Sequence, residues 1–277
     1  MVMSLYDQQL AHLPFECDNC ILHTCFGETH VLMAGPETAP PLVVLHGFDM
    51  PAPYILEMIQ PIIREYRVYA PDVIGQVGRS DTTYIPPRDN NYGRWLLEVI
   101  DALQLKRVPF IGVSFGSAIV MDLAVIASER ITRAAFVVPA GIVKRVIKPF
   151  YKLILPWYLY KLCPSPKRLH AAIRPIMAGA EEGLLSLFEG VIRYSRHLVR
   201  FPPGPFNREK LSNFDAPVLV LGVKDDIFFP ADAVVSRSRE IFPSLVAAEL
   251  FEGTHIPASA VRMKMNYRIL GFLKENR

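Results

Sequence analysis

The segment Gly112-Val113-Ser114-Phe115-Gly116 has the residue types and the spacing of a nucleophilic serine. Glycines on both sides of a serine allow a sharp turn, because residues without a Cβ let the neighbouring backbone pass closely. The apolar run VPFIGV precedes the motif and FGSAIVMDLAVIA follows it, which predicts a strand and a helix joined at the serine. The N-terminus of such a helix favours negative charge that develops beside it. Together these features predict that Ser114 is a nucleophile.

A serine hydroxyl needs a base before it becomes a useful nucleophile. The chain has seven histidines, and only His255, in FEGTHIP, follows a late apolar run and precedes the last predicted helix. We therefore expect His255 to be the general base. His46 also ends an apolar run, but it comes before the first helix of the sheet region, so we expect it to shape its loop.

The base in turn needs a carboxylate that orients it and stabilises its protonated form. Asp225 and Asp226 both follow the apolar run VLVLGVK, and both preserve the chain order serine, acid, histidine. We favour Asp225, which lies three residues after Gly222, and keep Asp226 as the alternative. For the oxyanion hole we expect two backbone N–H groups, those of Phe115 and of Phe48 in the loop HGFDM.

The elements that must position these residues alternate along the chain. Apolar runs predict buried strands at residues 41–47, 66–72, 108–114, 134–140, 216–225 and 246–251. Residues 20–35 read as a β-hairpin. Helical patterns occupy residues 54–64, 90–103, 115–127 and 258–274. This alternation is typical of an α/β protein with a mostly parallel sheet.

Residues 142–210 interrupt the alternation with eight prolines and no convincing strand. We expect a helical cap there, inserted between core segments 1–141 and 211–277 and lying over the carboxyl ends of the strands, where ligands bind. The cap holds 13 Lys and Arg against 4 Asp and Glu. Either it pairs with an acidic body, or it attracts anionic substrates or an anionic membrane. Residues 144–161 mix basic and aromatic side chains, but their prolines argue against one continuous helix, so we do not expect membrane contact.

The motifs PLVVLHGF, YAPDVIGQVGRSD, GVSFG, LGVKDD and GTH together resemble the α/β-hydrolase superfamily. The stretch RDNNYGRWLLEVIDAL followed by GVSFG is similar to serine carboxylesterase-like members. The resemblance implies an eight-stranded, mostly parallel sheet flanked by helices, a cap after the sixth strand, and a mainly structural turn at Asp72, Gly75, Gly78 and Ser80. Ser117 replaces a glycine usual in the family, and being small it still allows close packing. The serine nucleophile disfavours haloalkane dehalogenases and epoxide hydrolases, which use aspartate.

These features predict a serine hydrolase that cleaves small-molecule carboxylic esters through an acyl-enzyme on Ser114, with a preference for apolar acyl groups; whether the substrate is anionic stays open. A carbon–carbon bond hydrolase or lyase, or an acyltransferase, with the same triad is the alternative. A non-catalytic small-molecule receptor is a weaker one. The net charge of +3 disfavours nucleic-acid binding.

No cofactor is expected, since the sequence has no G-x-G-x-x-G, P-loop or H-E-x-x-H motif. Cys17 and Cys20 form a C-x-x-C near His23, but a second pair of ligands at similar spacing is missing, so we expect reduced, structural cysteines and no metal. The N-terminus lacks a basic segment followed by an apolar one, and we therefore expect a cytoplasmic protein.

Overall fold

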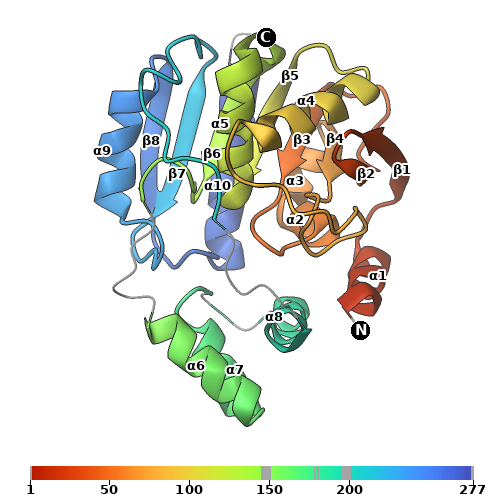
Figure 1. Cartoon of the computed structure of the whole chain (residues 1–277), viewed down its shortest axis with the longest axis vertical. Helices are drawn as coiled ribbons and strands as arrows, with labels where there is room; N and C mark the ends of the chain where they lie inside the picture. Colours follow the sequence, from red (N-terminus) through yellow and green to blue (C-terminus); the bar gives the residue numbers. More distant parts are fainter. Residues whose placement is uncertain (1, 145–150, 178, 180, 195–200, 276–277) are drawn as a thin grey trace.

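The computed structural model describes residues 2–144, 151–177, 179, 181–194 and 201–275. They form one eight-stranded sheet with helices on both faces, as Figure 1 shows, which confirms the predicted α/β class. The strands are β1 (Cys17–Thr24), β2 (Gly27–Ala34), β3 (Pro41–Leu45), β4 (Arg67–Pro71), β5 (Val108–Val113), β6 (Ile131–Val137), β7 (Val218–Val223) and β8 (Leu245–Phe251). The helices are α1 (Val2–His12), α2 (Ala52–Met58), α3 (Gln60–Ile63), α4 (Asn91–Ala102), α5 (Phe115–Ala127), α6 (Tyr151–Leu162), α7 (Pro166–Ile173), α8 (Glu182–Tyr194), α9 (Ala231–Ile241) and α10 (Ser259–Lys274), with a short 3₁₀ turn at Ser128–Arg130.

The sheet has the strand order β1-β2-β4-β3-β5-β6-β7-β8. Strand β2 runs antiparallel to both of its neighbours, and every other pair is parallel. Strands β1 and β2 form the expected hairpin, whose turn consists of Cys25 and Phe26 between the paired residues Thr24 and Gly27. All six residues of β7 are buried, as expected of a parallel strand covered on both faces.

Helices cover the two faces of the sheet in separate groups. Trp95 of α4, Ile119 of α5 and Val234 of α9 belong to one buried cluster with Phe110 of β5. The neighbouring residue Ile111 points the other way, into a second cluster that includes side chains of α2, α3 and α10. The carboxyl ends of the parallel strands are therefore held between two packed layers.

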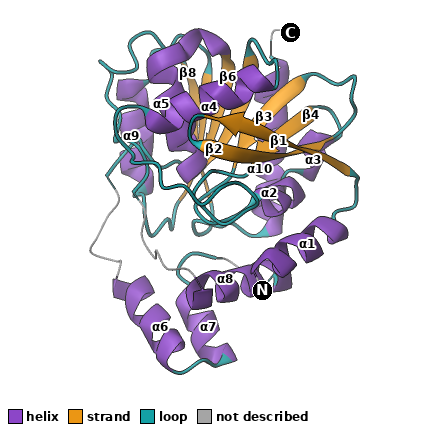
Figure 2. Cartoon of the chain, turned by 45° about the vertical axis from the view of Figure 1, so that its right-hand side comes forward, coloured by secondary structure: helices purple, strands orange, loops and turns teal. Residues whose placement is uncertain are grey.

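Three helices, α6, α7 and α8, lie between β6 and β7 in the chain and beside the sheet in space (Figure 2). Tyr160, Ile173 and Leu187, one from each helix, share a buried cluster with Met50 and Tyr54 of the main body. The predicted cap range of 142–210 also includes residues 145–150, 178, 180 and 195–200, which lie outside the described residues.

Pro156 lies inside α6 and does not interrupt it, since that helix runs from Tyr151 to Leu162. The prediction that residues 144–161 do not form a single helix is not tested over its whole length, because residues 145–150 lie outside the described residues. In contrast, the helix expected at residues 54–64 is divided into α2 and α3 near Pro61. Within the described part of the chain, no helix has the length and apolar character needed to span a membrane.

Candidate active site

Ser114 occupies the expected turn between β5 and α5. Its backbone has φ 49° and ψ −110°, a left-handed conformation that costs energy for a residue with a side chain. The Ser114 N–H donates to the Val137 carbonyl at 2.8 Å, and this hydrogen bond holds the turn in place. Close packing explains the flanking glycine: a Cβ added to Gly116 would lie 2.3 Å from the carbonyl oxygen of Leu45. Ser114 is thus presented at the carboxyl edge of the sheet on a strained turn.

The structure brings His255 to Ser114 from 141 residues further along the chain. The Ser114 hydroxyl lies 2.9 Å from Nε2 of His255, and Nδ1 of the same ring lies 2.8 Å from Oδ2 of Asp226. Because a carboxylate only accepts, Nδ1 carries the proton and Nε2 is left to accept the proton of the serine. The side chains of His255 and Asp226 are only 11% and 3% exposed, so water competes weakly for these bonds.

The prediction that Asp225 orients the histidine is wrong, because Asp226 makes that contact. Asp225 is exposed, and its N–H donates to the Gly253 carbonyl at 3.0 Å. The chain turns after β7, and Oδ1 of Asp226 accepts the backbone N–H groups of Phe228 and Phe229 at 2.8 and 3.1 Å. This local Asx-type turn directs the second oxygen of Asp226 at the imidazole.

A buried histidine shapes the loop that faces Ser114, as expected for His46. Its Nδ1–H donates to the Gly47 carbonyl at 2.7 Å, and its Nε2 accepts the N–H of Val73 at 2.8 Å. Complete burial lowers the pKa of His46, which keeps the ring neutral and this pattern intact. A Cβ added to Gly47 would lie 3.5 Å from the Cβ of Ser114, so this loop lines the site directly.

Gln76 is a second support of this loop, and sequence analysis did not identify it. Its side-chain oxygen accepts the N–H of Asp49 at 2.9 Å, while the Asp49 carboxylate accepts the N–H of Val77 at 3.2 Å. Asp49 itself has a positive φ of 52°. These reciprocal bonds fix the backbone around Phe48.

Asp72 has the structural role expected of it. Its carboxylate accepts bonds from the Tyr6 hydroxyl at 2.9 Å and from the N–H groups of Ala52 and Arg79 at 2.9 and 3.0 Å. Burial alone acts to raise the pKa of Asp72, but the hydrogen bonds with His30 and with these amides outweigh it, so the pKa lies below its usual value. Asp72 therefore joins α1 and α2 to the end of β4.

The cysteine pair in β1 does not form a site. Cys17 and Cys20 are free thiols three residues apart, so their side chains point to opposite faces of the strand and pack against different clusters. Burial raises the pKa of the Cys17 thiol to about 11. The C-x-x-C spacing therefore does not bring the two sulfur atoms together.

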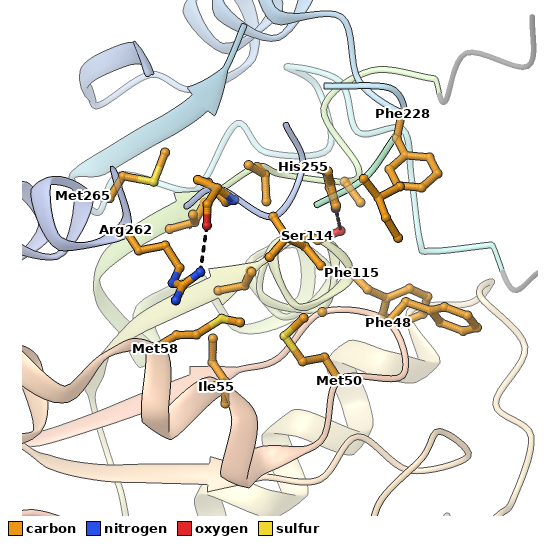
Figure 3. A pocket seen from close by; sticks show the side chains of 18 of the residues that line it. Phe48, Met50, Ile55, Met58, Ser114, Phe115, Phe228, His255, Arg262 and Met265 are labelled. Carbon is orange, nitrogen blue, oxygen red and sulfur yellow. Dashed lines mark hydrogen bonds between the residues drawn. The ribbon is translucent and has the colours of Figure 1, made fainter. Parts of the chain in front are cut away.

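A mostly apolar pocket of about 190 Å³ opens at Ser114 and His255. Figure 3 shows Met58, Met265 and Arg262 on one side of Ser114 and Phe228 on the other. The apolar lining of the pocket comes from the sheet region and from the segment between β6 and β7: Phe48, Met50, Ile55, Met58, Ile59, Ile111, Val113, Phe115, Val137, Val138, Ala140, Trp157, Ile176, Phe188, Pro202, Phe228, Phe229, Ile256, Pro257, Met265 and Ile269. The ring of Phe228 meets the His255 ring edge-on, with 4.9 Å between centroids, and limits its rotation.

Two polar side chains line the pocket besides Ser114 and His255. Arg262 donates to the carbonyl of Pro257 at 2.7 Å and to the Glu181 carboxylate at 2.8 Å. Asn266 donates to the carbonyl of Met58 at 2.7 Å. Since Glu181 immediately precedes α8, the Arg262–Glu181 pair connects the start of α8 to α10 beside the pocket.

Comparison with known proteins agrees with this fold and site. Residues 42–261 match the model of the alpha/beta hydrolase family, and the chain belongs to that family. The uncharacterized carboxylesterase nap of Bacillus subtilis (strain 168) is 26% identical over 96% of this chain and 90% of its own length. The carboxylesterase YbfK of the same organism is 24% identical over 97% of this chain and 92% of its own. The crystal structure of the Bacillus subtilis naproxen esterase superposes with a TM-score of 0.83 at 25% identity, covering 99% of this chain and 97% of that one. The protein is thus a hydrolase of the carboxylesterase-like type.

Proposed function

We propose that the protein hydrolyses carboxylic esters through an acyl-enzyme on Ser114, with His255 as general base and Asp226 as the acid that orients it. The supporting observation is the unbroken chain from the Ser114 hydroxyl to His255 at 2.9 Å and on to Asp226 at 2.8 Å. The first distance allows proton transfer, and the second allows the carboxylate to orient the imidazole.

The reaction then has two steps. Ser114 Oγ bonds to the ester carbonyl carbon while its proton moves to Nε2 of His255, and the same proton passes to the departing alcohol as the carbon–oxygen bond breaks. A water molecule then gives a proton to Nε2 of His255 and bonds to the acyl carbon. The bond from that carbon to Ser114 Oγ breaks, the proton passes from His255 to Oγ, and the acid is released.

We assign the oxyanion hole to the backbone N–H groups of Phe115 and Phe48. Phe115 is the first residue of α5, so its N–H has no partner within the helix. Phe48 lies in the loop held by His46 and Gln76, and its ring centroid is 6.0 Å from that of Phe115. Each donor contributes about 3 kcal/mol to stabilising the transition state.

The pocket favours apolar acyl groups over charged ones. Its walls are aliphatic and aromatic, and burying such a group contributes about 25 cal/mol per Å² of apolar surface. Arg262 is paired with Glu181, so this end of the pocket carries little net charge to attract an anion. Residues 142–210 form the cap in this scheme, between core segments 1–141 and 211–277, and they close the pocket with Trp157 and Phe188.

Steady-state hydrolysis of a series of p-nitrophenyl esters of increasing acyl length tests the proposal, with Ser114→Ala as control. We expect kcat/KM to rise from acetate to medium-length chains and activity to vanish in Ser114→Ala. A protein that binds these esters without turnover would support the receptor, and very poor turnover of the whole series would support carbon–carbon bond chemistry instead.

A further inference from the structure

Helix α6 exposes large apolar side chains along one side. Tyr151, Leu155, Tyr158, Leu159 and Leu162 are between 45% and 80% exposed. Their spacing of three and four residues places them on one face of the helix. Elsewhere in the described chain, exposed apolar side chains of this size are scattered over several elements. A continuous exposed apolar face of this kind marks an interaction surface.

The opposite side of α6 is firmly anchored, so the exposed face has a fixed orientation. The Trp157 indole N–H donates to the carbonyl of Ala172 in α7 at 3.1 Å, and the ring also lines the active-site pocket. The Tyr160 hydroxyl, on a residue that is 1% exposed, donates to Glu189 in α8 at 2.6 Å. These two contacts hold the helix in place, so a small rotation cannot bury its apolar face.

The surroundings of this face are strongly basic. Residues 142–180 contain eight Lys and Arg and no Asp or Glu. Lys152 and Lys161 on α6, and Lys167, Arg168 and Arg174 on and just after α7, are exposed. Figures 1 and 2 show the α6–α7 pair projecting beyond the main body.

Against the expectation from the sequence, which was no membrane contact, we propose that the α6–α7 hairpin docks on the surface of an anionic phospholipid bilayer. The exposed leucines and tyrosines of α6 would enter the interface, and the basic side chains around them would meet lipid phosphates. A second copy of this chain fits less well, because a twofold interface through this face brings the basic groups of both copies together. Trp157 lies on the inner side of the same helix and lines the pocket. Docking therefore brings the pocket close to apolar esters dissolved in the bilayer.

Flotation of the full-length protein with lipid vesicles tests the proposal. We expect binding to vesicles of mixed phosphatidylglycerol and phosphatidylcholine at low salt, and much weaker binding to phosphatidylcholine alone or at high salt. The triple variant Leu155→Ser, Tyr158→Ser, Leu162→Ser should lose binding. The double variant Lys161→Gln, Lys167→Gln should bind roughly 25-fold more weakly, or about fivefold per charge removed.

A matched variant on the main body, Lys264→Gln with Tyr267→Ser, removes one exposed cation and a tyrosine that is 63% exposed. It should bind like the unmodified protein, and all variants should keep their hydrolysis of a water-soluble ester, which reports the fold. The proposal is overturned if the protein does not bind anionic vesicles or binds both vesicle types equally. It is overturned too if the matched variant loses as much binding as the triple variant. It is also overturned if the triple variant only converts an oligomer into a monomer in size-exclusion chromatography, which would assign the α6 face to a second copy.

Discussion

Replacing Asp226 by asparagine should inactivate the enzyme, because the proton of the neutral His255 ring moves from Nδ1 to Nε2. In the structure, one carboxylate oxygen of Asp226 accepts two backbone N–H groups, from Phe228 and Phe229, and the other faces Nδ1 of His255. An asparagine must keep its oxygen toward the two backbone donors, which turns its NH₂ group toward the imidazole. The ring then places its proton on Nε2 and can no longer accept the proton of Ser114.

The magnitude follows from this change of tautomer. Loss of the correct tautomer in a serine triad lowers kcat by roughly 10⁴-fold, equivalent to about 5.5 kcal/mol of transition-state stabilisation. Asp225→Asn is the matched control, because that exposed side chain precedes the same turn without touching His255. We expect its kcat to stay close to that of the unmodified protein.

Steady-state hydrolysis of p-nitrophenyl butyrate measures both variants, and circular dichroism checks that each remains folded. A loss of less than tenfold in Asp226→Asn, or an equally large loss in Asp225→Asn, would refute the assignment of Asp226.

Other predictions concern stability and selectivity. Burial lowers the pKa of His46 from 6.5, so the contribution of the neutral ring to stability is present above that pH and declines as the pH falls. Urea unfolding should show the free energy of unfolding decreasing below pH 6.5 by up to about 1.4 kcal/mol per pH unit. If His46→Gln does not show this decrease, His46 is its cause. Gly116→Ala should lower the free energy of unfolding by about 3 kcal/mol, because the new Cβ meets the Leu45 carbonyl; an unchanged melting temperature would contradict the tight turn. Glu181→Gln should leave Arg262 unpaired beside the pocket and raise kcat/KM for esters with an anionic acyl group relative to neutral ones, an effect that salt should weaken; a salt-independent change would exclude electrostatic attraction.

The sequence predicted those features that depend on neighbouring residues. The turn at Ser114 has an apolar strand, two glycines and an apolar helix within about twenty residues, and the hairpin of β1 and β2 is equally local. Helix α9 was missed because only three of its residues, Val234, Ser238 and Ile241, are buried, so its apolar pattern is weak. Helix α1 was also missed, and it is linked to the rest of the chain by distant contacts, such as the bonds from Tyr6 to Asp72 and from Gln9 to Glu57.

The parts of the site that were not predicted depend on geometry between distant segments. The choice of Asp226 over Asp225 depends on how the chain turns after β7, which the two adjacent aspartates do not reveal. An Asx turn, in which Asp226 accepts the amides two and three residues later, was the local signal available. The Arg262–Glu181 pair and the bond from the Ile256 N–H to the Ile176 carbonyl at 2.7 Å join residues about 80 positions apart, which one sequence does not indicate.

The most direct test of the account is to react the folded protein with a fluorophosphonate and locate the adduct by mass spectrometry. We predict rapid formation of one adduct on Ser114, none in Ser114→Ala, and strongly slowed labelling in His255→Ala, since the base activates the hydroxyl. A correctly folded protein that forms no adduct on Ser114, or that labels at the same rate without the imidazole, would contradict it.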